Sequence, residues 1–179
     1  MRSVQASQPA LPRAFARPAT RFDALPPSPF FKHGLRNPTG PAEKILATRR
    51  IAAYTDSRGR RALLYLIRTS KQICEFTFWR GGAGGGCNDA ASFFAGRHVV
   101  AGSGHLITGV ADDSVTTLVV VGTHGGRHRV TPTSDGGFIY DCRAYSGCTG
   151  CVVDHVEAFD SAGQRVEVDR VTGRCTRKR

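Results

Sequence analysis

From residue 49 onward, short runs of β-branched and aromatic residues alternate with turn-forming residues. The runs recur at intervals of about 8–12 residues, a spacing typical of antiparallel all-β domains. The sequence therefore predicts a β-sandwich or an open barrel-like sheet, and it leaves the pairing order of the strands open. The predicted strands are 49–55, 61–69, 72–79, 97–102, 105–110, 115–121, 127–133, 137–142, 152–159 and 164–169.

The side-chain pattern within two of these runs indicates which of their faces are buried. In 72–79, Cys74, Phe76 and Phe78 lie opposite Glu75 because successive side chains of a strand point to opposite sides. The run 61–69 is apolar on both sides, which is typical of a central strand buried on both faces.

Four glycine-containing turns separate strands of the domain. Glycine supplies the positive φ that such turns need, and Asp or Ser side chains cap the turn. The turns are predicted at 56–59, 123–126, 134–137 and 160–163. We expect the glycine run 81–86 to be a flexible hairpin loop, and 88–95 to be a short helix with Asn88 or Asp89 as its cap.

The N-terminal segment has a different composition. It contains most of the nine prolines, which restrict the backbone and remove hydrogen-bond donors. We therefore expect residues 1–48 to form a basic arm, mostly extended or disordered. A short helical turn is expected at 20–25 before Pro26 stops it, and phenylalanines of the arm are expected to anchor parts of it to the domain, namely Phe15, Phe22, Phe30 and Phe31.

The charge of the 179-residue chain, formally +11, is concentrated at its ends. Residues 1–50 carry nine basic and two acidic side chains, residues 171–179 carry four basic ones, and residues 51–170 carry twelve of each. We interpret this as a disulfide-stabilised β domain, 49–170, whose charges balance over 51–170, between solvated basic segments. Weak attraction of these segments to anionic surfaces is expected, and no specific nucleic-acid partner is predicted. No apolar stretch in this chain reaches the roughly 18 residues of a membrane-spanning helix.

The first two of the six cysteines are predicted to form a disulfide. Cys74 and Cys87 flank a segment that contains the glycine run, so its ends can approach each other. A bridge closing such a loop contributes about 3 kcal/mol to stability.

The other four cysteines allow three interpretations. The favoured one is two further disulfides, Cys142 with Cys151 and Cys148 with Cys175. The alternatives are a zinc site, formed by the three clustered cysteines with His155 or Cys175, and a redox-active pair of Cys148 and Cys151.

Disulfides imply an oxidising compartment, whereas the first residues of this chain do not form a signal sequence. We expect an extracytoplasmic protein, secreted or anchored, whose signal precedes this start. The alternative is a cytoplasmic protein with reduced thiols.

No motif in the chain predicts catalysis, a cofactor or a bound metal. The glycine run lacks the Lys-Ser/Thr that follows in a phosphate-binding loop. Phe76, Phe78 and Trp79 beside Arg80 would suit a strip for stacking bases, but a core role for the two phenylalanines is favoured. The leading hypothesis is a non-enzymatic interaction or binding module, and the alternative is a zinc-binding or thiol-redox protein.

Several segments carry a resemblance that spans much of the chain. They are 22–26 (FDALP), 49–51 (RRI), 64–67 (LYLI), 73–74 (IC), 86–87 (GC), 109–115 (GVADDSV) and 158–163 (AFDSAG). In this order they resemble a family of extracytoplasmic actinobacterial proteins. The resemblance implies an extracytoplasmic location. The family has no established activity, so the resemblance implies no catalytic residues.

Overall fold

The computed structural model describes residues 11–27, 43–80, 82–94, 99–101, 106–123, 125–142 and 153–170. These residues form β-strands and two single-turn 3-10 helices, which confirms the predicted all-β class. The elements are η1 Arg13–Phe15, η2 Arg21–Asp23, β1 Ala47–Thr55, β2 Arg61–Arg68, β3 Gln72–Trp79, β4 Gly82–Asp89, β5 Val99–Ala101, β6 Leu106–Ala111, β7 Thr117–Gly122, β8 Arg127–Val130, β9 Gly137–Asp141, β10 Val153–Phe159 and β11 Arg165–Arg170.

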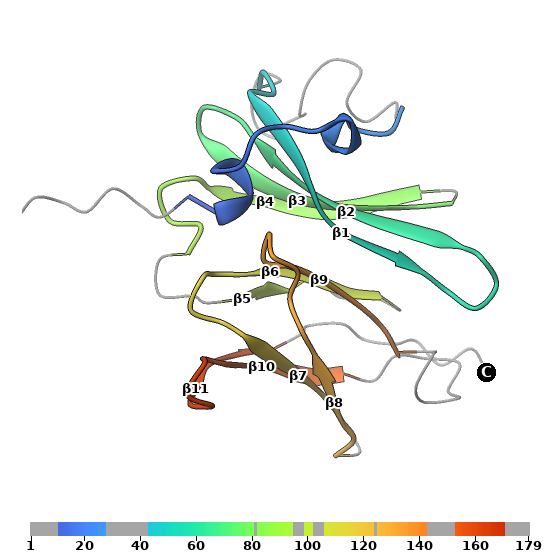
Figure 1. The fold of residues 1–179 in the computed structure, drawn as a ribbon, viewed down its shortest axis with the longest axis vertical. Coiled ribbons are helices and arrows are strands. Elements are labelled where there is room, and N and C mark those ends of the chain that lie inside the picture. The colour runs from blue at the N-terminus through green and yellow to red at the C-terminus, as the bar shows by residue number, and fades with distance from the viewer. Residues whose placement is uncertain are drawn as a thin grey trace, which may run out of the picture.

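The strands form three antiparallel sheets stacked in layers (Figure 1). The N-terminal sheet has the order β1-β2-β3-β4, the middle sheet β5-β6-β9, and the C-terminal sheet β11-β10-β7-β8. The middle sheet lies between the other two, as Figure 1 shows. Its edge strand β9 lies beside β1, and its other edge strand β5 lies beside β11.

The middle sheet is buried on both faces, and each face belongs to a separate core. Phe138 and Ile107 pack with Leu118 of β7 against the C-terminal sheet. On the opposite face, Val110 and Ile139 pack against the N-terminal sheet. Alternate residues of β6 and β9 therefore contribute to different cores, which the period of two makes possible.

The N-terminal sheet is likewise covered on both faces, as the apolar run 61–69 predicts. Leu64 of β2 packs toward the middle sheet. On the outer face, Ile67 and Cys74 are fully buried beneath Leu25 and Ile45. The arm thus supplies part of the outer cover of this sheet.

A short polar network lies between the N-terminal and middle sheets. The Thr77 hydroxyl donates to Thr108 Oγ1 at 3.0 Å, and the Thr108 hydroxyl donates to Glu75 Oε1 at 3.0 Å. All three side chains are buried. Since buried polar groups need partners, this network makes the polar face of β3 compatible with an interior position.

The four predicted turns are confirmed. Gly59, Gly125, Gly136 and Gly163 have φ between 73° and 82°. In the first turn Asp56 Oδ1 accepts hydrogen bonds from the backbone N–H groups of Arg58 and Arg60. Asp160 performs the same role in the last turn.

The glycine run is an edge strand, so the prediction of a flexible loop is wrong. Gly82–Asp89 pairs with β3 along its whole length. A Cβ atom at Gly85 would lie 1.9 Å from the Glu75 carbonyl oxygen, so the absence of a side chain permits this close approach. Glycine therefore serves strand packing here instead of loop flexibility.

The predicted helix at 88–95 is also wrong. Asn88 and Asp89 belong to β4, and the described residues 90–94 form turns. Asp89 Oδ1 accepts a hydrogen bond from Ala91 N at 2.8 Å. The acidic residue caps a turn, as Asp side chains do outside helices as well as at their starts.

The described part of the arm, 11–27, has two 3-10 turns and otherwise irregular backbone. The predicted helical turn near residue 20 is confirmed as η2, with Thr20 as its N-cap in a capping box with Asp23. Phe15 packs against the core beneath the N-terminal sheet. Phe22 is about half exposed, and its carbonyl accepts a hydrogen bond from the Tyr65 hydroxyl.

Arginines near the N-terminus bind the arm and domain together, so the interpretation of this charge as solvated is wrong for them. Arg17 contacts Asp23 and Asp135, each at 2.7 Å. Arg49 donates to the carbonyl oxygens of Ala14 and Arg17. Part of the positive charge therefore satisfies carboxylates and backbone carbonyls within the fold.

None of the helices in the described ranges is long and apolar enough to cross a membrane.

Candidate functional site

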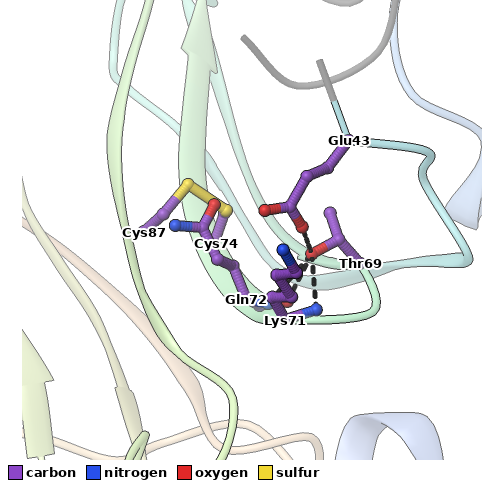
Figure 2. The surroundings of a disulfide bond; sticks show 6 residues. All are labelled: Glu43, Thr69, Lys71, Gln72, Cys74 and Cys87. Atoms are coloured by element: carbon purple, nitrogen blue, oxygen red, sulfur yellow. Dashed lines mark hydrogen bonds between the residues drawn. A yellow bond between two sulfur atoms is a disulfide. The ribbon is translucent and has the colours of Figure 1, made fainter. Parts of the chain in front are cut away.

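Cys74 and Cys87 form the predicted disulfide (Figure 2). They lie directly opposite each other in β3 and β4, with Cα atoms 4.0 Å apart. Cys74 is fully buried, whereas Cys87 is exposed at the edge of the sheet. The bridge therefore joins the glycine-rich edge strand to the interior of the domain.

Cys142 is also disulfide-bonded, and it is buried in the core beside the C-terminal sheet. Its bonding partner is not among the described residues, and neither are Cys148, Cys151 and Cys175. Their predicted pairings, and the zinc and thiol-redox alternatives, stay predictions. Within the described ranges no three His, Cys, Asp or Glu side chains are placed to hold a metal ion.

The turn between β2 and β3 lies next to the disulfide, as Figure 2 shows. The Thr69 hydroxyl donates to the Glu43 carboxylate and accepts a hydrogen bond from Gln72 N at 2.9 Å. Thr69 is 1% exposed, so Glu43 and the turn satisfy a buried hydroxyl. This contact fixes the start of the segment that leads into β1.

The alternative of an aromatic strip is wrong, because Trp79 lies on the opposite face of β3 from Phe76 and Phe78. Phe78 packs edge-on against Tyr65, with ring centroids 5.4 Å apart, and Phe76 contacts the small cluster around Cys74. These two have the core role that was favoured. The Trp79 side chain lies on the other face of β3 and is 39% exposed.

Glycines of β4 provide the surface on which the Trp79 indole lies. A Cβ atom at Gly82 or at Gly84 would come within 3.1 Å of indole atoms. A side chain at either position would therefore push the ring away by a few tenths of an ångström. The glycine run thus has a second purpose, which is to hold an exposed aromatic ring flat against the sheet.

Trp79 lines an open cleft of about 160 Å³ at one end of the stacked sheets. The cleft lies where the β1–β2 turn and the end of β3 meet the middle sheet. Its other lining residues are Tyr54, Asp56, Arg60, Arg61, Ala62, Arg80, Leu106 and Asp141. Aromatic, cationic and acidic groups from four strands and two turns therefore converge on this cleft.

One ion pair on the cleft wall is fixed in place. Arg60 Nε donates to Asp56 Oδ2 at 2.7 Å, and the turn amides donate to Asp56 Oδ1. Although desolvation raises the pKa of Asp56, these hydrogen bonds together hold it below its usual value. Asp56 is therefore ionised and engaged at neutral pH.

Two further guanidinium groups in the cleft are available to a ligand. Arg61 and Arg80 are exposed, and neither forms an ion pair or side-chain hydrogen bond with a described residue. Asp141, 3% exposed, is the other carboxylate of the wall. The cleft thus offers donors, acceptors and an aromatic face within one small space.

Sequence reasoning does not find most of this cleft. Tyr54, Arg61 and Asp141 come from separate strands, and no motif links them. A signal for Trp79 does exist, because strict alternation along 72–79 separates it from Phe76 and Phe78.

A second hollow lies on the outer face of the C-terminal sheet and includes Arg127 and Arg129. Nearby Glu157, 4% exposed, is bound by Arg127, His155 and Arg165. The Arg127 hydrogen bond is the main cause that lowers the pKa of Glu157. These charges largely satisfy one another, which favours a structural role for them.

Two further polar side chains in the described ranges contact their neighbours. The His128 ring lies 5.6 Å from the Tyr140 ring. Asp112 Oδ1 accepts hydrogen bonds from the backbone and side chain of Ser114, as in a turn.

Comparison with known proteins adds no relative to this description. No family model, no curated protein and no solved structure matches the chain. The family resemblance of the sequence therefore stays a prediction, and a functional proposal depends on the fold and the cleft.

Proposed function

We propose that this chain is a non-enzymatic, extracytoplasmic binding module whose ligand site is the cleft beside Trp79. The observation that carries the proposal is the glycine surface that holds this indole partly exposed next to two guanidinium groups without described partners. A large aromatic side chain usually lowers the free energy by being buried. Its placement at an open cleft is typical of a recognition surface.

The cleft size restricts the ligand to one ring at a time. Pockets that hold drug-sized ligands measure roughly 300 Å³ or more, whereas this cleft measures about 160 Å³. The ligand is therefore one unit of a polymer or a single terminal group. A sugar ring suits the cleft because its C–H face packs on an indole and its hydroxyls both donate and accept hydrogen bonds.

The charges of the cleft favour an acidic sugar. Arg61 and Arg80 provide donors that pair strongly with a carboxylate. Asp56 and Asp141 on the same wall disfavour a densely charged phosphate by repulsion, so a ring that carries a single carboxylate is the better match. A uronic-acid unit of an anionic polysaccharide combines both requirements.

Two observations support the other parts of the proposal. Asp56 is ionised and bound by donors at neutral pH, so it serves as an acceptor and not as an acid catalyst. The Cys74–Cys87 disulfide favours an oxidising compartment.

The test uses the fluorescence of Trp79, the single tryptophan of the chain. Oligogalacturonate is titrated into the full-length protein, with a neutral malto-oligosaccharide in parallel. We expect a saturable change in emission with the acidic oligosaccharide and a much smaller one with the neutral one. Equal responses to both would contradict the acidic specificity, and no response to either would contradict the cleft as a sugar site.

A matched set of variants assigns the effect to the cleft. Arg61→Gln with Arg80→Gln removes both available cations and should weaken binding by about tenfold or more. Arg58→Gln removes an exposed cation of the adjacent turn that does not line the cleft. It should leave the affinity unchanged apart from weak screening effects.

A further inference from the structure

Six strands end the three sheets of the described part of the chain; β1 lies beside β9 and β5 beside β11, which leaves β4 and β8 as the two edges with no strand of another sheet beside them. β4 pairs with β3, and β8 pairs with β7. Open edges present unpaired backbone groups, and proteins usually protect them with charges, prolines or bulges. β8 carries Arg127 and Arg129, whereas β4 has no charged residue before Asp89 and no register shift against β3.

The geometry of the disulfide indicates which backbone groups of β4 face outward. The Cα atoms of Cys74 and Cys87 are 4.0 Å apart, the close spacing of a non-hydrogen-bonded antiparallel pair. In such a pair the N–H and C=O groups of Cys87 point away from β3. Because the register is continuous, the same holds for Gly85 and Ala83.

We propose that β4 is a self-association edge, through which two copies of this chain pair antiparallel about a two-fold axis. The N-terminal sheets of the two copies then form one continuous sheet. Pairing at an edge uses the outward N–H and C=O groups of both strands. The disulfide supports it by holding β4 in register before the second copy binds.

Charge complementarity identifies the second copy as the occupant. Arg80 stands just before β4, and Asp89 is its last residue. Antiparallel self-pairing places each Arg80 near the Asp89 of the other copy, with no like charges opposed. Asp89 uses Oδ1 to cap its own turn, and no described residue donates to Oδ2.

The test compares two substitutions at one residue by sedimentation velocity of the full chain over a range of concentrations. Ala83→Pro removes an outward N–H, a change that an open edge tolerates within the monomer. Ala83→Thr keeps the N–H and is the matched control. We expect wild type and Ala83→Thr to dimerise alike, and Ala83→Pro to weaken dimerisation by about tenfold or more.

Two further measurements check the pairing mode. Raising the salt concentration from about 0.05 M to about 0.5 M should weaken the dimer because the end charges are exposed. Hydrogen exchange at residues 83, 85 and 87 should slow on dimerisation. A wild type that stays monomeric, or a dimer unaffected by Ala83→Pro, overturns the proposal. Slow exchange of these amides in a monomer also overturns it, since another segment then covers the edge.

Discussion

Arg17 and Asp23 form a bidentate ion pair, with Nη1 2.7 Å from Oδ2 and Nη2 2.9 Å from Oδ1. The same carboxylate accepts hydrogen bonds from Arg50 N in β1 and from Thr20 N in the arm. Arg17 also contacts Asp135 in the turn before β9. One acidic side chain, 2% exposed, thus joins the arm to an edge strand of the N-terminal sheet.

Replacing Asp23 with alanine should detach the arm and destabilise the domain. The change removes the bidentate partner of the Arg17 guanidinium, which keeps Asp135, and leaves the N–H groups of Thr20 and Arg50 without this acceptor, at an expected cost of about 2–3 kcal/mol. Urea denaturation gives the loss of stability. Limited proteolysis with trypsin should show faster cleavage after Arg21, which precedes Phe22 in the arm.

The matched control is Asp113→Ala, which removes a more exposed partner of the arm. Arg13 Nε lies 3.4 Å from Asp113 Oδ1, and the Asp113 side chain is 73% exposed. Exposed pairs contribute little, so we expect a change below about 0.5 kcal/mol. Equal effects of the two substitutions would mean that Asp23 does not hold the arm.

Stability should fall as the pH drops below about 4. The Arg17 hydrogen bond is the main cause that holds the pKa of Asp23 well below its ordinary value of 3.8. The unfolded chain therefore binds a proton at a higher pH than the folded one. The stabilisation is complete above the unfolded pKa and is lost as the pH falls toward the folded one.

Denaturation midpoints measured between neutral pH and pH 3 test whether stability falls with decreasing pH. Wild type should lose stability over the acid range, and Asp23→Asn should show a shallower dependence because it lacks one of the contributing carboxylates. Glu157, whose pKa is also lowered, accounts for part of the residual slope. If the stability of Asp23→Asn depended on pH as steeply as that of wild type, the effect would belong to other groups.

Most strands could be predicted because hydrophobic and polar residues alternate along them according to which side chains are buried. The run 72–79 matches β3, and the turns at Gly59 and Gly163 have the expected positive φ. β4 could not be predicted in this way, because glycine has neither polarity nor strand preference. Its pairing depends on the disulfide and on β3, which are not local properties of the run.

The candidate site was less predictable than the fold. The Cys74–Cys87 pair could be anticipated because a chain segment of suitable length connects the two residues. The cleft depends on how the sheets stack. The hydrophobic pattern of the sequence does not determine how the strands pair or how the sheets stack. Glu75 shows the same limit, since its buried position depends on the Thr108 hydroxyl from another sheet.

Removing the disulfide should loosen β4 more than any other described strand. In Cys74→Ala/Cys87→Ala, we expect a loss of about 3 kcal/mol, as for a loop of similar length. Hydrogen exchange in 82–89 should become faster, with smaller changes in β7 and β10. The control is wild type with its disulfides intact, and unchanged exchange in β4 would show that the bridge does not hold this strand.

Two neighbouring glycines of β4 should respond differently to the addition of one methyl group. Gly85→Ala places a Cβ atom 1.9 Å from the Glu75 carbonyl oxygen, so β4 must move away from β3. We expect a loss of about 2 kcal/mol, typical of a forced overlap in a packed region. Gly86→Ala meets no atom within 4 Å and should change stability by less than about 0.5 kcal/mol, or increase it slightly by restricting the unfolded chain. Thermal denaturation followed by Trp79 emission measures both variants. Equal stability of the two would contradict the close approach of β3 and β4 at Gly85.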